Sequence, residues 1–498
     1  MNFTKKRVAV ITVLVLTCLI SLTLRLTLDV IVKAVIDMEL KEKLPLKNGS
    51  LAFHFWEKPP VPVDFKIYVF DIVNPDEILA NSSVPVVMER GPYVYKLHLK
   101  KTDIKYHKEN STVQYRQKQQ FVYDRESSVG PDTETFTTVN IPFLTVANIF
   151  QNEPIWLQAL LDSYFRAENE TAFMRRSVRD IWWGYEDPVL KQGSDIAKKF
   201  NISSPILTGK FGFYMDRNNT DDGLFSVFSG LDHNFKDYAT IDLWNGMRSQ
   251  NVWKSNFANR IMGSGDGSMQ PPQITKDSSL SMFDTNLRRT LKLKFEKGTT
   301  YKGVDVLRFL VPYSEFDSAK DNPANAGFCL PDTQHCPPSG ATNMSSVAYT
   351  APLVASLPHF VGGDPYYQKQ VRGMKPSQAK HQPYYEYHAI TGVALNAAKR
   401  FQLNVKTQAY PDFETFKTMA DAYVPVLWID GIAIMDKPTM SLFRDQIQAP
   451  LNALVYVKIA MIVVPVLSVV SLVLLLLYWR KKDKKLNEPK EEEEQIIN

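Results

Sequence analysis

Two hydrophobic stretches lie near opposite ends of the chain, with a long stretch of mixed polar and apolar residues between them. Residues 8–24 and 459–479 contain no charged side chain. A helix rises about 1.5 Å per residue, so the second stretch forms about 31 Å of helix, enough to cross a hydrocarbon core about 30 Å thick. The first stretch reaches a similar length when Arg25 extends its guanidinium to the interface and the helix continues past it. The pattern predicts transmembrane helices at 8–28 and 458–479.

A cleaved signal peptide is the alternative interpretation of the first stretch. Signal peptides have an apolar region of about 7–15 residues followed by a small-x-small cleavage site. No such site follows residues 20–24. The sequence therefore favours an uncleaved signal anchor.

Basic residues flank both predicted spans on the side of the chain ends. Three of them occupy positions 5–7, and a basic cluster follows the second span. Because basic flanks stay on the cytosolic side, residues 1–7 and 480–498 are predicted to be cytosolic. Residues 29–457 then form a lumenal or extracellular domain.

The region between the spans carries seven Asn-x-Ser/Thr sequons, which is where glycosylation enzymes could reach them. The predicted N-glycosylation sites are Asn48, Asn81, Asn110, Asn169, Asn201, Asn218 and Asn343.

The chain has three cysteines, and their positions separate them into two kinds. Cys18 lies inside the first span, whereas Cys329 and Cys336 lie in the lumenal region. In an oxidising compartment these two are predicted to form a disulfide. The same spacing could supply half of a metal site, but no second pair lies nearby and His335 is isolated. We therefore predict a disulfide and no metal.

Alternation of apolar and polar residues recurs along the lumenal region. The composition, with 44% hydrophobic and 12% aromatic residues and no repeat, indicates one large globular domain. A period of two is typical of strands with one buried face, so an antiparallel sheet or barrel is predicted. The alternating segments are 65–70, 93–99, 113–116, 291–295, 306–310 and 401–405.

Between about residues 144 and 190 the apolar spacing becomes helical, which predicts a helical cap inserted into the domain. Its second predicted helix carries Arg175, Arg176 and Arg179, which would lie within an arc of about 100° and form one basic stripe. Such a stripe is either a solvated helix face or a docking surface for carboxylates, phosphates or acidic protein patches.

Motifs spread in order over nearly the whole chain resemble those of the class B scavenger receptors. They are WEKPP at 56–60, NPDEIL at 74–79, GPYVY at 91–95, WGY at 183–185, WNG at 244–246, LPHF at 357–360 and AKRFQ at 398–402. Residues 325–329 and 400–404 look most similar to a lysosomal branch of that family. The resemblance implies an α+β fold: an irregular antiparallel β-barrel with a helical-bundle cap and an internal apolar tunnel for fatty acids, sterols or phospholipids.

One departure from the family concerns cargo binding. At the position of Arg176, the lysosomal branch has a histidine thought to release a bound acid hydrolase at low pH. Arginine stays charged throughout that range, so it cannot act as this switch. The resemblance therefore gives only weak support to hydrolase binding by this chain.

The tail after the second span contains an acidic run followed by two aliphatic residues. Glu492 stands four residues before the pair Ile496 and Ile497, which looks like an acidic dileucine sorting signal read by a cytosolic adaptor protein. The alternative is an acidic disordered tail with no sorting function.

The sequence contains no H-E-x-x-H or G-x-S-x-G motif, and the glycine-rich loop 263–267 lacks the lysine of a phosphate-binding loop. Pairs of catalytic carboxylates cannot be located from sequence, so a hydrolase remains an alternative. We predict a non-enzymatic receptor of the endolysosomal or plasma membrane, without cofactor or nucleic-acid partner. It would bind lipid or lipoprotein and could dimerise through the helical cap. The competing hypothesis is a cargo receptor that sorts a lysosomal hydrolase.

Overall fold

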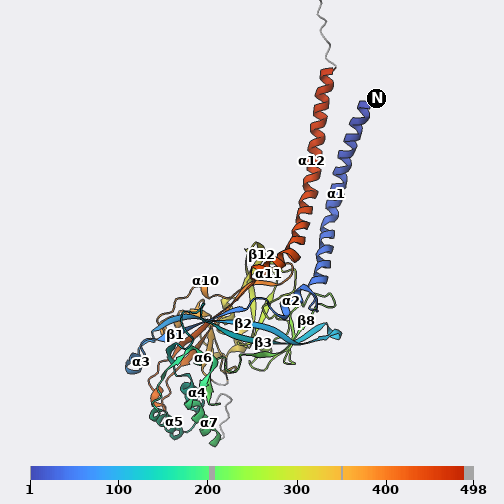
Figure 1. Ribbon diagram of the computed structural model, residues 1–498. Coiled ribbons are helices and arrows are strands. Elements are labelled where there is room, and N and C mark those ends of the chain that lie inside the picture. Colours follow the sequence, from blue (N-terminus) through green and yellow to red (C-terminus); the bar gives the residue numbers. More distant parts are fainter. Residues whose placement is uncertain (1, 201–207, 349–350, 487–498) are drawn as a thin grey trace, which may run out of the picture. The chain divides into compact units, whose positions relative to one another are not determined.

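The computed structural model describes residues 2–200, 208–348 and 351–486; the side chains of residues 2–4, 25, 26, 81 and 486 fall outside this description. The chain divides into two compact units (Figure 1). One is a helical unit made from the two ends of the chain, and the other is the central unit, Lys43–Asp436. Each unit is described separately below.

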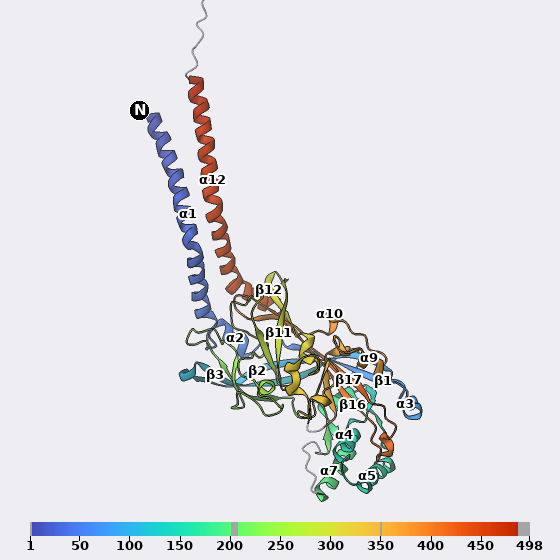
Figure 2. The same cartoon turned by 180° about the vertical axis from the view of Figure 1, so that it is seen from behind.

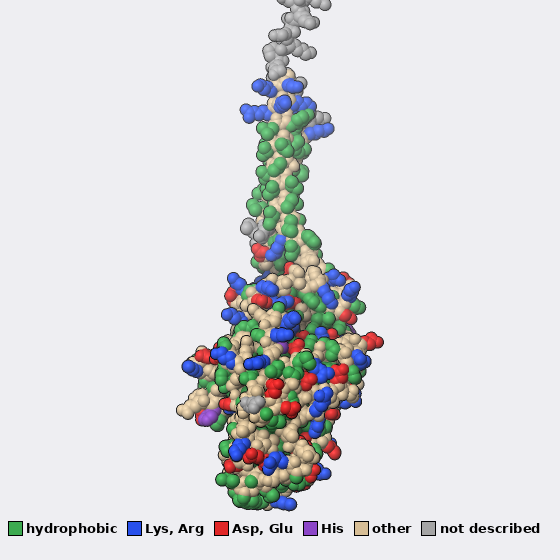
Figure 3. Space-filling model, turned by 90° about the vertical axis from the view of Figure 1, so that its left-hand side faces the viewer, with side chains coloured by type: hydrophobic (Ala, Val, Ile, Leu, Met, Phe, Trp, Pro, Cys, Tyr) green, Lys and Arg blue, Asp and Glu red, His purple; other side chains and the backbone are tan. Residues whose placement is uncertain are grey.

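The helical unit contains two long helices, α1 (Asn2–Lys43) and α12 (Ala449–Leu486), the second preceded by α11 (Lys437–Phe443) and a π-helical turn. Both predicted spans fall within these helices, which are long and apolar enough to cross a membrane. Hydrophobic side chains cover their surfaces, and lysine and arginine gather at one end (Figure 3). These features fit a two-span topology.

Ion pairs join α1 and α12 at two levels. Arg7 makes two hydrogen bonds to the Asp483 carboxylate, at 2.6 and 2.8 Å, and Lys458 Nζ lies 2.8 Å from Asp29 Oδ1. At 1.5 Å per residue the two pairs are about 33 Å apart along α1 and about 38 Å apart along α12. A hydrocarbon core is about 30 Å thick, so both pairs can lie at its two interfaces. The charges thus fix the antiparallel register of the helices.

We expect the charge reversal Asp29→Lys to separate the ends of the two helices, because it places two ammonium groups side by side. In a Cys18→Ser background, cysteines introduced at Ser21 and Ser468 report the pairing, since both serines are buried and lie at matching heights in this register. Their oxidative cross-linking in membranes should fall severalfold.

The double variant Asp29→Lys with Lys458→Asp restores an ion pair with the opposite polarity and should restore the cross-linking. Lys481→Glu is the control. It reverses a charge elsewhere in α12, the helix that contains Lys458, and should cross-link like the parent. Equal cross-linking of the single reversal and the parent would contradict the role of the ion pair.

The central unit is built on a large antiparallel sheet (Figure 1). Its main strand order is β10-β11-β12-β15-β16-β17-β1-β2-β3-β8-β9, with β14 joining β13 to β16. All six alternating segments fall in strands of this sheet, which confirms the predicted antiparallel sheet. The strands are β1 (Val63–Ile72), β2 (Val87–His107), β3 (Thr112–Asp124), β8 (Thr220–Phe228), β9 (Ile241–Trp244), β10 (Leu280–Asp284), β11 (Arg289–Tyr301), β12 (Val304–Leu310), β13 (Ala341–Asn343), β14 (Leu353–Ser356), β15 (Tyr384–Tyr387), β16 (Ala394–Thr407) and β17 (Ala422–Ile434).

The sheet is not the closed barrel that the resemblance implied. Its end strands, β9 and β10, are not paired with each other. Residues 263–265 run between them instead: Gly263 N–H donates to Ile241 O at 2.8 Å, and Phe283 N–H donates to Gly265 O at 2.9 Å. The Trp244 and Phe283 rings also meet across this junction, with centroids 5.2 Å apart. An intervening loop, and not a strand ladder, therefore connects the two edges.

A helical insertion, α4 to α7, packs on the central sheet. Its helices α4 (Ile141–Phe150), α5 (Ile155–Ala167) and α7 (Pro188–Lys199) lie together at one end of the central unit (Figures 1 and 2). The predicted helical periodicity is confirmed in α5. Its Leu157, Leu161 and Phe165 are buried at the expected spacing.

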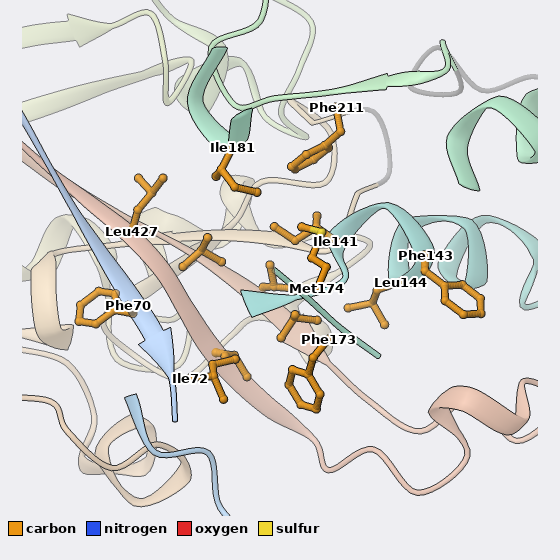
Figure 4. Packing of buried hydrophobic residues seen from close by; sticks show 14 of the residues in the cluster. Phe70, Ile72, Ile141, Phe143, Leu144, Phe173, Met174, Ile181, Phe211 and Leu427 are labelled. Atoms are coloured by element: carbon orange, nitrogen blue, oxygen red, sulfur yellow. The ribbon is translucent and has the colours of Figure 1, made fainter. Parts of the chain in front are cut away.

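The core between the insertion and the sheet is dense and largely aromatic and aliphatic (Figure 4). Phe70 and Leu427 from the sheet, Phe143 and Leu144 from α4, and Ile181 belong to one cluster of buried side chains. The remaining elements are short: α2 (Leu51–Glu57), α3 (Pro75–Asn81), α6 (Val178–Trp183), α8 (Asn256–Asn259), α9 (Pro365–Gln370), α10 (Gln378–His381), the pair β4 (Thr135–Val139) and β5 (Phe173–Ser177), and the pair β6 (Tyr185–Glu186) and β7 (Lys210–Phe211).

Candidate functional site

A cavity of about 320 Å³ lies against one face of the central sheet. Successive side chains of a strand point to opposite faces, so residues two apart share a face. The strands line the cavity in this way, with Val63 and Phe65 from β1; Leu97, Leu99 and Lys101 from β2; Gln117 and Gln119 from β3; Leu395, Ala397, Lys399 and Phe401 from β16; and Ile429, Gly431 and Ala433 from β17.

Elements from both edges of the sheet close the cavity. Phe225 from β8, near one edge, and Met282 and Phe283 from β10, at the other, belong to its lining. Phe55 and Trp56 from α2 cover a further side. The sheet therefore curves around an interior lined mainly by aromatic and aliphatic side chains, which suits an apolar ligand.

Small side chains leave part of this space open. Ala397 and Ala433 are register partners on β16 and β17, and both line the cavity. Gly431 lines it as well, and a Cβ added there would meet its nearest atom, the Lys399 carbonyl oxygen, at 3.5 Å. The volume thus arises from small residues in two adjacent strands, where substitution can fill it.

Lys101 places a positive charge on this apolar wall, although its side chain is only 3% exposed. Its Nζ donates to Gln117 Oε1 at 2.9 Å and lies 5.0 Å from the Trp56 ring centroid and 5.1 Å from that of Tyr115. Burial lowers the pKa of Lys101, and the charge of Asp266 opposes this shift. Within the described part of the chain, no carboxylate lies within 4.0 Å of this ammonium.

Two other charged groups at the cavity are paired, and Asp266 accepts hydrogen bonds from the Ser268 backbone and hydroxyl. Lys399 Nζ lies 2.9 Å from Asp284 Oδ2, and Asp222 accepts a hydrogen bond from Arg217 at 3.2 Å. Their charges are compensated within the protein. Lys101 is thus the group best placed to attract an anionic or strongly hydrogen-bonding part of a ligand.

The predicted basic stripe of Arg175, Arg176 and Arg179 is wrong in its geometry. Arg175 and Arg176 lie in strand β5, which pairs with β4, so they occupy opposite faces and not one helical stripe. Arg176 stacks on the Tyr185 ring, with its guanidinium carbon 4.8 Å from the centroid. Arg179 lies in α6 and binds both Asp132 oxygens, at 2.9 and 3.1 Å.

The two lumenal cysteines, Cys329 and Cys336, are joined in a disulfide with a Cα separation of 4.8 Å. Their sulfurs are therefore not available as metal ligands. The loop that they close is short, so the bond shapes a local turn.

Three predicted glycosylation sites, Asn48, Asn110 and Asn169, are exposed. Asn218 is also exposed, but its side chain exchanges hydrogen bonds with the Phe121 backbone. Asn343 is half-buried. Their modification stays a prediction. The side chain of Asn81, all of Asn201 and the sorting residues Glu492, Ile496 and Ile497 lie outside the described residues.

The resemblance implied an apolar tunnel, but sequence reasoning did not identify the residues that line the cavity, Lys101 among them. One feature could have pointed to the lysine. In the alternating segment 93–99, Leu97 and Leu99 share a face, and Lys101 continues that face in the same phase. A lysine in register with the apolar positions of a strand indicates a buried cation.

Comparisons with known proteins cover most of the chain. A sequence model of the CD36 family matches residues 12–476. Lysosome membrane protein 2 of Rattus norvegicus is 30% identical over 417 residues, which cover 84% of this chain and 84% of the relative. Scavenger receptor class B member 1 of Sus scrofa is 32% identical over 418 residues, or 84% of this chain and 80% of the relative. Human lysosome membrane protein 2 is 32% identical over 417 residues, with 84% of each chain covered.

Proposed function

Because the chain belongs to the CD36 family, we propose that it is a non-enzymatic membrane receptor that binds lipid or lipoprotein ligands and transfers lipid through its central unit. The apolar cavity is the observation that carries this proposal. Moving one methylene group from water to an apolar site is worth about 0.8 kcal/mol, so a long acyl chain gains on the order of 10 kcal/mol by entering such a space. In this proposal the cavity is part of a tunnel that shields lipid from water.

Lys101 supplies the polar end of the proposed site. A largely apolar cavity in which one ammonium has no carboxylate partner favours an amphiphile whose head reaches that ammonium while its chain contacts the aliphatic wall. Gln117 and the two aromatic rings hold the ammonium in place. The position of Lys101 therefore supports binding of a lipid in a defined orientation.

Lipid transfer by the full-length chain tests this function directly. The chain is reconstituted into vesicles, and particles carrying a fluorescent lipid serve as donors. Transfer into these vesicles should be severalfold faster than into protein-free vesicles of the same composition. Equal rates would overturn the proposed transfer function.

A second candidate function is docking of a lumenal protein, such as a lysosomal hydrolase or a second copy of this chain, on the helical insertion. Ile155, Trp156 and Leu160 of α5 are 66%, 58% and 54% exposed, which is unusual for side chains of this size. Pulldown of lumenal proteins at neutral and acid pH tests it. Trp156→Glu should abolish any specific capture, and recovery of no hydrolase or self-complex at either pH would dismiss this candidate.

We also propose a cellular compartment on the basis of the family membership. The relatives named above include a lysosome membrane protein and a scavenger receptor, so we place this chain in the endolysosomal or plasma membrane, with both ends cytosolic. Glu492, Ile496 and Ile497 would direct sorting through an adaptor. Replacing both isoleucines with alanine should move the protein from lysosomes to the cell surface.

A further inference from the structure

Two buried histidines stack on each other in the central unit, away from the cavity lining. The His359 and His381 ring centroids are 4.4 Å apart with an interplanar angle of 14°, and the residues are 3% and 4% exposed. His359 belongs to a turn that follows β14, and His381 ends α10, which lies beside the sheet (Figure 2). The Trp428 ring of β17 packs against both, at 6.3 and 5.4 Å.

Backbone hydrogen bonds fix the protonation of both rings. Lys375 N–H donates to His359 Nδ1 at 3.0 Å, and Ser377 N–H donates to His381 Nδ1 at 3.1 Å. A ring nitrogen that accepts a hydrogen bond carries no proton. His359 therefore has its proton on Nε2, which contacts Glu89 Oε2 at 2.5 Å. This arrangement requires a neutral imidazole in both residues.

Several charged groups surround the stack. Glu89 comes from β2 and also accepts a hydrogen bond from Trp428 Nε1 at 2.8 Å. Arg400 of β16 pairs with Asp430 of β17 at 2.8 Å, and Lys380 precedes His381 in α10. Burial raises the pKa of the neighbouring Tyr68 of β1 to about 12, so its phenol stays neutral.

These surroundings keep His381 neutral. Burial lowers its pKa to about 4, and His359, Arg400 and Lys380 act in the same direction, while Glu89 opposes them. If residues 372–382, which contain His381, are released from the sheet into water, the ring regains the ordinary pKa of about 6.5. The released state therefore binds more protons. The free energy that favours the attached state is fully present above pH 6.5 and decreases as the pH falls toward 4.

We propose that the His359–His381 stack is a proton-operated latch that holds residues 372–382 on the sheet at neutral pH and releases them at endolysosomal acidity. A proton on Nδ1 of His381 would face the Ser377 N–H that now donates to it, so one hydrogen bond is lost and two donors oppose each other. The device is separate from the cavity and does not depend on lipid transfer.

Backbone strain in the turn that contains His359 favours loss of the stack. His359 and Phe360 both have positive φ, at +54° and +55°, which costs free energy in residues other than glycine. The hydrogen bond from His359 N–H to Gln402 Oε1, at 2.7 Å, and the stack hold this turn in place. Loss of the stack removes one of these restraints.

Amide hydrogen exchange of the full chain in detergent tests the latch. Exchange of peptides covering 372–382 is measured at pH 7.4 and 5.0 and corrected for the intrinsic pH dependence. We expect it to become on the order of tenfold faster at pH 5.0. Peptides from β11 serve as the internal reference and should keep their protection. Unchanged amide exchange of residues 372–382 between the two pH values, or an equal loss of protection in β11, would overturn the proposal.

The variant His381→Asn separates protonation from packing. The asparagine Oδ1 can accept the Ser377 N–H in place of Nδ1 and does not titrate, so exchange should stay slow at both pH values. His107→Asn, at a half-buried histidine far along the chain from the stack, should respond like the parent. An acid response in His381→Asn as large as in the parent would overturn the assignment. If this variant does not fold, the measurement on the parent chain still decides.

Discussion

Replacing Ala397 and Ala433 together with phenylalanine is expected to lower the lipid that co-purifies with the chain at least tenfold. The two alanines are register partners on β16 and β17, and both line the 320 Å³ cavity. Ala397 is buried and Ala433 is exposed, so the added phenyl groups would fill part of the cavity and obstruct its open side. Lipid extracted from equal amounts of purified parent and variant is measured by mass spectrometry. Gly431→Leu fills the same wall from a third position and should act in the same direction.

Ile432→Phe is the matched control for this experiment. Ile432 lies between two lining residues of β17 and therefore points to the opposite face of the sheet. Its bound lipid should equal that of the parent. Overpacking a core costs about 1–3 kcal/mol, so thermal unfolding is measured for every variant. Parent-like lipid content in folded Ala397→Phe/Ala433→Phe protein would contradict binding in the cavity.

Removing the Arg289 side chain is expected to produce the largest loss of stability, about 3–5 kcal/mol for Arg289→Leu. The residue is 2% exposed, and its guanidinium donates to Thr342 Oγ1 at 3.2 Å and Asn325 Oδ1 at 3.0 Å. It also stacks on Phe328 at 3.6 Å and lies 4.0 Å from Glu315. Without it, Glu315 remains buried with no nearby guanidinium, and burial already raises the pKa of that carboxyl.

Thermal unfolding of the purified full chain measures this effect as a fall of several degrees in Tm. Arg289→Lys should not restore stability, because a single ammonium cannot bond two partners in the planar geometry of the guanidinium. Adding Glu315→Gln to Arg289→Leu should recover part of the loss, since it removes the uncompensated charge. Exposed Arg125→Leu is the control. A Tm for Arg289→Leu within one degree of the parent would refute the account.

The strands that the sequence predicts are those with one apolar face, such as β1 and β2. Strand β17 lacks this pattern, because every residue from Ala422 to Gly431 is buried. It lies between β16 and β1 in the middle of the sheet, where both faces are covered, and it carries Pro425 at a register shift. Alternation cannot reveal such a strand.

The prediction of a second helix in the cap is wrong for a related reason. Phe173 and Met174 are buried in β5, whereas Val178, Ile181 and Trp182 are buried in α6. A short strand followed directly by a short helix produces apolar spacings that imitate one continuous helix. The arginines between them were therefore assigned to one face that does not exist.

The cavity depends on the register between neighbouring strands, which cannot be read from the sequence. Ala397 and Ala433 leave space only because β16 and β17 align them across the sheet, 36 positions apart in the chain. The position of β8 and β10 against the same interior likewise follows from the curvature of the whole sheet. The resemblance implied a tunnel, but residue-level lining required the structure.

Photo-cross-linking tests the central claim most directly. The full chain in membranes is incubated with a lipid that carries a diazirine in its acyl chain, irradiated, digested and mapped by mass spectrometry. We predict that the cross-links fall on cavity-lining residues such as Phe65, Leu97 and Ile429 and are lost in Ala397→Phe/Ala433→Phe. Cross-links confined to the outer surface, or unchanged in that variant, would contradict a lipid-binding cavity.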